Sequence, residues 1–186
     1  MRKGAVVLAG GVLGVACTVT TINPYGVGPF PGTASQIVGA GGGIVTANDG
    51  TTLLIPPGAL TADVTVTIGI DPSPAPLRIA QTLTYGHVFG PAGQTFAVPV
   101  CVTLAYEPGL LPAGAVPTDV DVYAEHGDAG TYAVLPTLGT DPTHVTGMTT
   151  QLAEMVVGYG DVPEVDAGPD GDVCDGSDIE AGEAGL

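Results

Sequence analysis

The side chains best suited to catalysis or metal binding are few and widely spaced in this sequence. They are three histidines and three serines: His87, His126, His144, Ser35, Ser73 and Ser177. Zinc sites use closely spaced ligands, and one large class of serine hydrolases places its nucleophile in a Gly-x-Ser-x-Gly turn. Neither pattern occurs here. The glycine-rich stretch 39–44 begins like a dinucleotide-binding motif, but it leads into a strand pattern, whereas a dinucleotide site needs a helix at that point. We therefore expect no catalytic residues, no metal ligands and no cofactor.

Cys17 is the residue for which the local sequence suggests a modification. Arg2 and Lys3 precede an apolar run, 4–16, which is well short of the ~20 residues that span a bilayer and is typical of a signal peptide. The run ends in Leu13-Gly14-Val15-Ala16-Cys17, which resembles a bacterial lipobox, although its Leu lies one position further back than usual. This predicts a signal peptide over 1–16 and a lipid on Cys17. The alternative is ordinary cleavage after Ala16, which gives a secreted protein.

The charge distribution limits the possible partners. The chain has 3 basic and 19 acidic residues, and without 1–16 a single base, Arg78, remains against all 19 acids, a net charge of −18. Nucleic acid is excluded because phosphate binding needs clustered Lys and Arg. Thr18, following the lipobox-like sequence, implies an outer-membrane lipoprotein held to the membrane by its lipid. The partner is then an unknown envelope or extracellular protein.

The last 26 residues, 161–186, contain nine of the acidic residues and little that could pack. They are expected to form a disordered acidic tail that collects calcium weakly. Cys174 lies in this tail, and it either pairs with Cys101 in a disulfide, as export allows, or both remain thiols. The stretch 174–183 is similar to the start of a Cys-rich surface repeat, or it is a plain acidic terminus.

The elements between these ends are expected to be strands. The chain has 30 Gly and 17 Pro, which disfavour long helices. Apolar residues alternate over 64–70 and 96–106, as in strands with one face on a core. Shorter strands are expected at 52–55, 85–89, 119–123, 132–135, 144–146 and 152–157, with a hairpin turn at 48–50. The sequence predicts an all-β antiparallel sandwich of about eight strands over 37–160, preceded by a tether over 17–36.

Three sequence elements resemble those of the ZU-five domain family. They are Gly41-Gly42-Gly43-Ile44-Val45, Leu54-Ile55-Pro56-Pro57-Gly58-Ala59-Leu60, and Phe89-Gly90-Pro91-Ala92-Gly93-Gln94-Thr95-Phe96. ZU-five domains are β-sandwich modules of ankyrins, netrin receptors, zonula occludens proteins and bacterial envelope proteins. The resemblance implies an interaction or structural module over about 37–158. Independently of it, Gly58 is expected to adopt a conformation that a side chain would forbid, and both phenylalanines are expected to enter one core.

Some ZU-five domains cleave their own backbone at a His-Phe-Ser element, in which the Ser hydroxyl attacks the preceding carbonyl and the His takes its proton. The corresponding positions here are Gln151, Leu152 and Ala153, so both reacting groups are missing. We therefore expect a non-catalytic protein of the cell envelope. The alternatives are a self-cleaving module and a calcium-dependent adhesin or glycan-binding protein that uses exposed Tyr123 and Tyr132.

Overall fold

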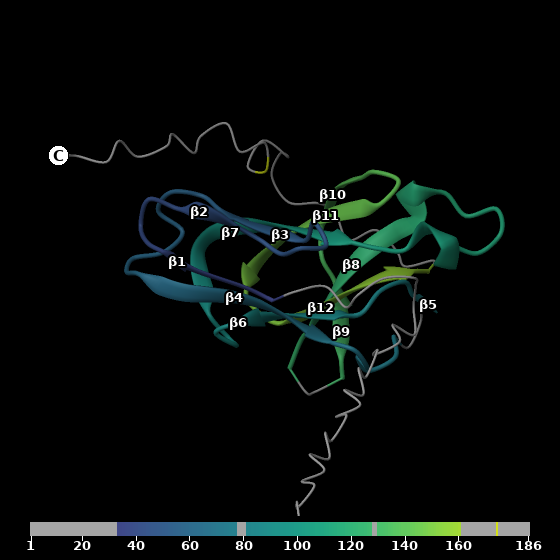
Figure 1. Ribbon diagram of the computed structural model, residues 1–186, viewed down its shortest axis with the longest axis horizontal. Helices are drawn as coiled ribbons and strands as arrows, with labels where there is room; N and C mark the ends of the chain where they lie inside the picture. The colour runs from purple at the N-terminus through teal and green to yellow at the C-terminus, as the bar shows by residue number, and fades with distance from the viewer. Residues whose placement is uncertain (1–32, 78–80, 128–129, 161–173, 175–186) are drawn as a thin grey trace, which may run out of the picture.

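Alternating apolar and polar residues produce two antiparallel sheets that pack face to face (Figure 1). The computed structural model describes residues 33–77, 81–127, 130–160 and 174. The predicted all-β sandwich is confirmed. Within these ranges no helix has the length and apolar character needed to cross a bilayer. The proposed signal peptide, Cys17 and most of the tether and tail lie outside the described residues.

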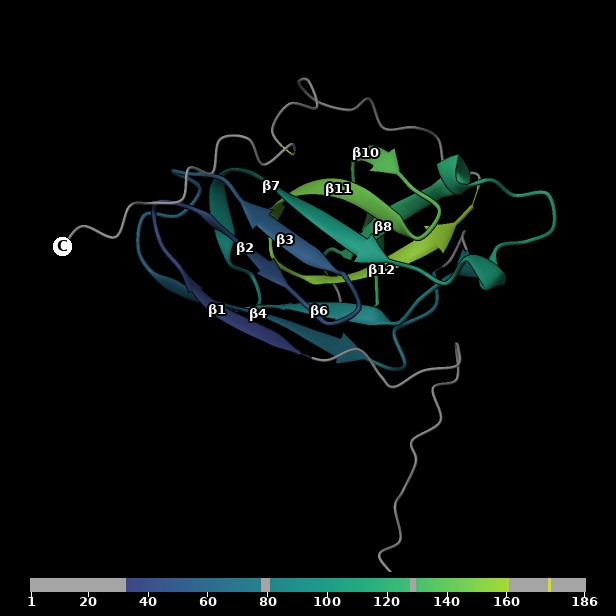
Figure 2. The same ribbon diagram turned by 45° about the horizontal axis from the view of Figure 1, so that its top comes forward.

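The larger sheet has the order β1-β4-β6-β12-β8-β9, and β5 pairs with β12. Three of its strands, β1, β4 and β6, lie side by side in Figure 2. Its strands are β1 (Ala34–Val38), β4 (Val64–Asp71), β5 (Gln81–Thr82), β6 (Gly86–Gly90), β8 (Val120–Glu125), β9 (Tyr132–Val134) and β12 (Glu154–Tyr159). The smaller sheet has the order β10-β11-β7-β3-β2. It contains β2 (Gly43–Thr46), β3 (Thr52–Ile55), β7 (Thr95–Ala105), β10 (Thr137–Thr140) and β11 (His144–Gln151). Two short 3₁₀ helices, η1 (Pro108–Leu110) and η2 (Pro117–Asp119), lie between β7 and β8.

The strand number and the domain start differ from the sequence prediction. The described residues form twelve strands; β1, β5 and β10 were not predicted, and β2 was implied only as the first arm of the predicted hairpin. β1 begins at Ala34, three residues before the predicted start of the sandwich, and pairs with β4 from Ala34↔Ile68 to Val38↔Val64. Edge strands bury little, and only Val38 of β1 is buried, so this strand carries no apolar alternation.

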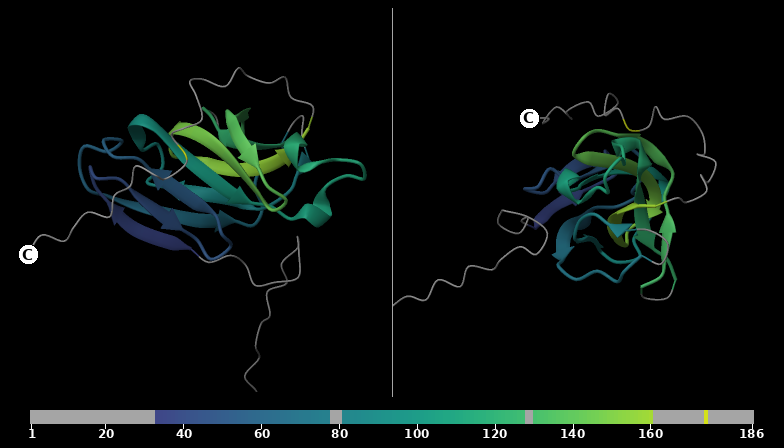
Figure 3. Two further views of the ribbon diagram at one scale, coloured as in Figure 1. Left: turned by 90° about the horizontal axis from the view of Figure 1, so that it is seen from above. Right: turned by 90° about the vertical axis from the view of Figure 1, so that its right-hand side faces the viewer.

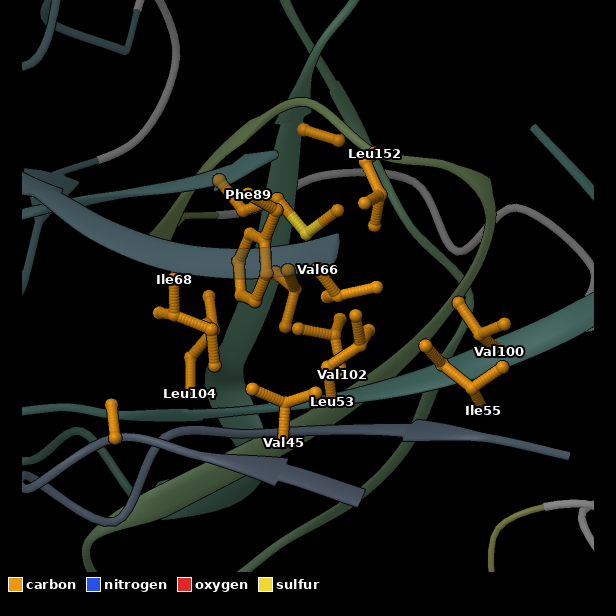
Figure 4. Packing of buried hydrophobic residues seen from close by; sticks show 14 of the residues in the cluster. Val45, Leu53, Ile55, Val66, Ile68, Phe89, Val100, Val102, Leu104 and Leu152 are labelled. Carbon is orange, nitrogen blue, oxygen red and sulfur yellow. The ribbon is translucent and has the colours of Figure 1, made fainter. Parts of the chain in front are cut away.

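The core is formed by the facing sides of the two sheets (Figure 4). Val66, Ile68 and Phe89 of the larger sheet and Leu53, Val102 and Leu104 of the smaller sheet are fully buried. The inward-facing side chains of β7 follow the predicted alternation from Val100 to Leu104, but Val98, which the same pattern placed inward, is 39% exposed. Each large buried aliphatic side chain stabilises the fold by about 1.5–3 kcal/mol relative to exposure. The opposed apolar faces therefore fix how the sheets pack.

The predicted turns have the expected geometry. Thr46 pairs with Thr52 across the hairpin turn, where Gly50 has φ +90°. Gly58 has φ +79°, in the left-handed region that glycine tolerates best. Phe89 and Phe96 both enter the core, with exposed fractions of 0% and 7%. The peptide bond Gly90-Pro91 between these two rings is cis.

Tyr123 is buried, so the prediction that it is exposed was wrong. It lies on the outer face of the larger sheet, and its exposed fraction is 2%. A side chain at Gly158 would meet both Leu77 and the Tyr123 ring, which shows that the segment containing Leu77 covers this face. Burial, together with nearby Asp121, raises the pKa of Tyr123 to about 12. The adhesin alternative therefore loses one of its two proposed aromatic residues, and the other, Tyr132, is half-buried rather than exposed, with its hydroxyl bonded to Glu154.

Candidate functional site

Gln151, Leu152 and Ala153 form the crossing from one sheet to the other. β11 of the smaller sheet ends at Gln151, and β12 of the larger sheet begins at Glu154. The Leu152 N–H donates to the Gln94 carbonyl at 2.8 Å, and the Leu152 carbonyl accepts from the Gly93 N–H at 3.0 Å. Leu152 is 1% exposed and belongs to the core. The three residues that correspond in position to the cleavage element thus form a tightly bonded crossing.

Two hollows meet at this crossing. One has a volume of about 310 Å³ and the other about 420 Å³. Four lining residues are common to both: Glu125, His126, Gln151 and Ala153. The larger hollow extends between β9 and β11, from opposite sheets, and the smaller one extends toward β6. We call the two hollows together the seam groove.

The seam groove is apolar at one end and acidic at the other. Apolar side chains of the larger hollow include Pro99, Leu135, Pro136 and Met148. Glu154 lines only the smaller hollow. The groove therefore offers separate surfaces for an apolar group and for a polar or charged one. Volumes of this size hold small ligands or a few side chains.

Fixed hydrogen bonds orient the carboxylates of the seam groove. The Tyr132 hydroxyl donates to Glu154 Oε1 at 2.6 Å, and the Gly130 N–H donates to Glu125 Oε1 at 2.7 Å. Burial raises the pKa of Glu154 above its ordinary value, and nearby Asp71 and Glu125 raise it further, while the bond from Tyr132 offsets part of the rise. Burial and the bond to Glu154 also raise the pKa of Tyr132. These acidic groups lie in a mutually repulsive environment.

The side chains near the crossing determine whether the backbone could be attacked there. Ala153 presents only a methyl group. Two threonines, Thr149 and Thr150, precede Gln151 in β11, and Thr149 Oγ1 donates to the Gln151 carbonyl at 2.9 Å and accepts from the Gln151 N–H at 3.1 Å. These bonds stabilise the irregularity of β11 between Thr149 and Gln151. The predicted strand at 144–146 is confirmed as part of β11, so Thr146 does not substitute for the missing nucleophile.

A buried polar network joins the two sheets away from the seam groove. His87 Nε2 in β6 lies 2.8 Å from Asp49 Oδ2 and 3.0 Å from Thr51 Oγ1, both at the β2–β3 turn. Burial opposes ionisation of Asp49, but the bonds from His87 and from the Thr51 N–H outweigh it and lower the Asp49 pKa. His87 and Thr51 are fully buried, which gives a substrate no access. The network therefore has a structural role, and sequence spacing alone gives no indication of it.

Cys101 and Cys174 form a disulfide, which decides between the two alternatives left open by the sequence. Cys101 lies on the outward side of β7, opposite the core-facing Val100 and Val102, yet it is only 3% exposed. The predicted tail is therefore attached to the smaller sheet at Cys174. The rest of 161–186, where weak calcium binding is expected, lies outside the described residues. Within the described ranges, no three His, Cys, Asp or Glu side chains are arranged to hold a metal ion.

No protein-family model matches the chain, and no curated protein matches it.

Proposed function

We propose that this chain is an exported, lipid-anchored protein of the cell envelope whose β-sandwich is a non-catalytic interaction or structural module. The observation that carries the export part is the disulfide between Cys101 and Cys174. Disulfides persist in oxidising compartments and are rare in the cytosol. The basic start, the short apolar run and Cys17 are independent support for the same conclusion.

We also propose that the sandwich is a ZU-five domain. The three sequence elements lie at corners of the sandwich, where their residue types suit the backbone conformation and the packing. Gly58 has the positive φ that follows the double proline, and the two phenylalanines of the third element bury their rings in one core. Two packed antiparallel sheets are also the architecture that this family implies.

The module is proposed to bind rather than to cleave. The crossing at Gln151–Ala153 has neither a nucleophile nor a base in the family's positions, and its backbone is held by the corner at 93–94. An open groove at the same place offers surface for a partner. The self-cleaving alternative therefore has weaker support than the binding one.

Intact-mass analysis of the protein from cell envelopes tests the anchor. The expected mature chain begins at Cys17 with the added mass of a diacylglycerol group, and the Cys17→Ser variant lacks that mass. A mature chain that begins at an unmodified Cys17 or at a later residue would contradict the anchor and leave export standing. A protein that retains 1–16 and fractionates with the cytosol would contradict export as well.

Cross-linking in intact cells tests the interaction role. Wild-type protein is expected to give a discrete higher-mass adduct with another envelope protein. An unfolded variant such as Val100→Asp serves as the control, since a buried unpaired carboxylate destroys the core to which Val100 belongs. Absence of any adduct from the wild-type protein would count against an interaction module.

A further inference from the structure

We propose that the seam groove binds an extended, basic peptide segment of a partner protein, with apolar side chains in the larger hollow and a lysine or arginine between Glu125 and Glu154. This inference rests on the interaction role proposed above and names its surface and the chemistry of its partner.

The shape of the groove fits a short stretch of chain. The hollows, of about 310 and 420 Å³, meet at Glu125, His126, Gln151 and Ala153, so one ligand can occupy both. The larger is lined by Pro99, Leu135, Pro136 and Met148, which suit aliphatic side chains. A peptide with alternating side chains can place apolar groups here and direct a polar one toward Glu154.

The charge of the groove selects a basic occupant. Glu125 and Glu154 lie on its lining, and Asp71 is near enough to raise the pKa of Glu154 further. The described residues include neither lysine nor arginine, so no such side chain among them competes with a partner's cation for these carboxylates. A bound cation would relieve the repulsion among these carboxylates. An acidic peptide would increase it.

The walls of the groove are already ordered, which lowers the cost of binding. Tyr132 fixes Glu154, the Gly130 N–H fixes Glu125, and backbone hydrogen bonds hold Leu152 in the crossing. Side chains held in place before association lose little conformational entropy when a partner binds.

Titration with defined peptides tests the proposal. The probe is a labelled nine-residue peptide that alternates valine and lysine, and the comparison peptide has glutamate in place of lysine. The lysine peptide is expected to shift amide resonances of residues 124–126, 133–135 and 148–154 in ¹⁵N-labelled protein, and the glutamate peptide to leave them unchanged. Shifts spread over other acidic surfaces, or equal binding of both peptides, would overturn the proposal.

Two matched pairs of variants separate groove binding from general attraction to an acidic protein. Glu154→Gln keeps an acceptor for Tyr132 and is expected to weaken lysine-peptide binding about fivefold, whereas Glu107→Gln, outside both hollows, changes it less than twofold. Ala133→Trp fills the larger hollow and is expected to weaken binding more than tenfold, whereas Ala62→Trp, at another exposed site, does not. Equal effects within either pair would contradict the proposal.

The cellular cross-link distinguishes failure of this inference from failure of the interaction role. If wild-type protein and Ala133→Trp give the same adduct, the module binds elsewhere and the groove proposal is wrong. If Ala133→Trp loses the adduct while Ala62→Trp keeps it, the groove is the binding surface. If wild-type protein gives no adduct, the interaction role fails, and the peptide titration still decides whether the groove binds basic peptides.

Discussion

Cys174 is bonded to Cys101, which lies 73 residues earlier, in a central strand of the smaller sheet. The bond closes a loop that contains all the strands from β8 to β12, so it restricts the unfolded chain strongly. Figure 3 shows how these later strands contribute to both layers of the sandwich. The acidic C-terminal region is therefore a covalent part of the domain, although its composition suggests an independent tail.

The disulfide is expected to stabilise the fold by about 4 kcal/mol, because a loop of this length loses much chain entropy when its ends are joined. Cys174→Ala, or truncation after Gly160, should lower the free energy of urea unfolding by that amount. Reduction should have the same effect on the wild-type protein and none on Cys174→Ala. If truncation changed stability by less than about 1 kcal/mol, the bond would not stabilise the domain.

Replacing His87 is expected to destabilise the sandwich by about 2–4 kcal/mol, because the change leaves Asp49 and Thr51 without their partner on the other sheet. The measurement is urea unfolding of His87→Ala at neutral pH. His144→Ala is the control, since that histidine is partly exposed. Equal losses for both variants would contradict a special role for the buried network.

Asp49 should make stability depend on pH in the acidic range. Its folded-state pKa lies below the ordinary value of 3.8, so the unfolded chain binds more protons between the two pKa values. The contribution of Asp49 is therefore complete above about pH 4 and is lost as the pH falls through the folded pKa. The stability difference between wild type and Asp49→Asn should shrink from pH 6 to pH 3, and a constant difference would refute this.

Gly42→Ala is expected to destabilise the domain by at least about 2 kcal/mol. Gly42 has φ +75°, and an added Cβ would meet the Ile55 carbonyl oxygen and the Pro56 backbone. The neighbouring Gly41 provides a matched control, because nothing lies within 4 Å of a Cβ added there. Thermal unfolding should therefore show a large shift for Gly42→Ala and a small one for Gly41→Ala.

The purified protein is expected to remain one polypeptide. Attack on the Leu152 carbonyl needs a hydroxyl or thiol on residue 153, where alanine has only a methyl group. Denaturing gels of fresh protein test this, and a break between Gln151 and Glu154 that persists with protease inhibitors would favour the self-cleaving alternative. Cleavage in the double variant Gln151→His, Ala153→Ser would show that the scaffold has suitable geometry and lacks only the reacting groups.

The sequence predicts those parts of this molecule that depend on local pattern. β4 and β7 are long and alternate apolar and polar residues, and Gly50 and Gly58 follow recognisable turn chemistry. Edge strands such as β1 are missed because they bury too little to create a pattern.

The seam groove and the buried polar network both depend on contacts between segments that are far apart in the sequence. Glu154 meets Tyr132 across 22 residues, and His87 meets Asp49 across 38. No spacing rule brings such pairs together without the fold. The resemblance to ZU-five domains points to residues 151–153, which line the seam groove, but it gives no indication of Glu125 or Glu154.

The link between Cys101 and Cys174 also determines how the domain would respond to mechanical force. A pull applied to the chain beyond Cys174 passes through the sulfur atoms directly into β7, between its neighbours β11 and β3, and bypasses β12. Residues 102–173 are shielded from extension while the bond is intact. If the proposed lipid holds the other end of the chain, the load would run through the bond to β7 and back to β1, so only the residues before Cys101 could extend while the bond is intact.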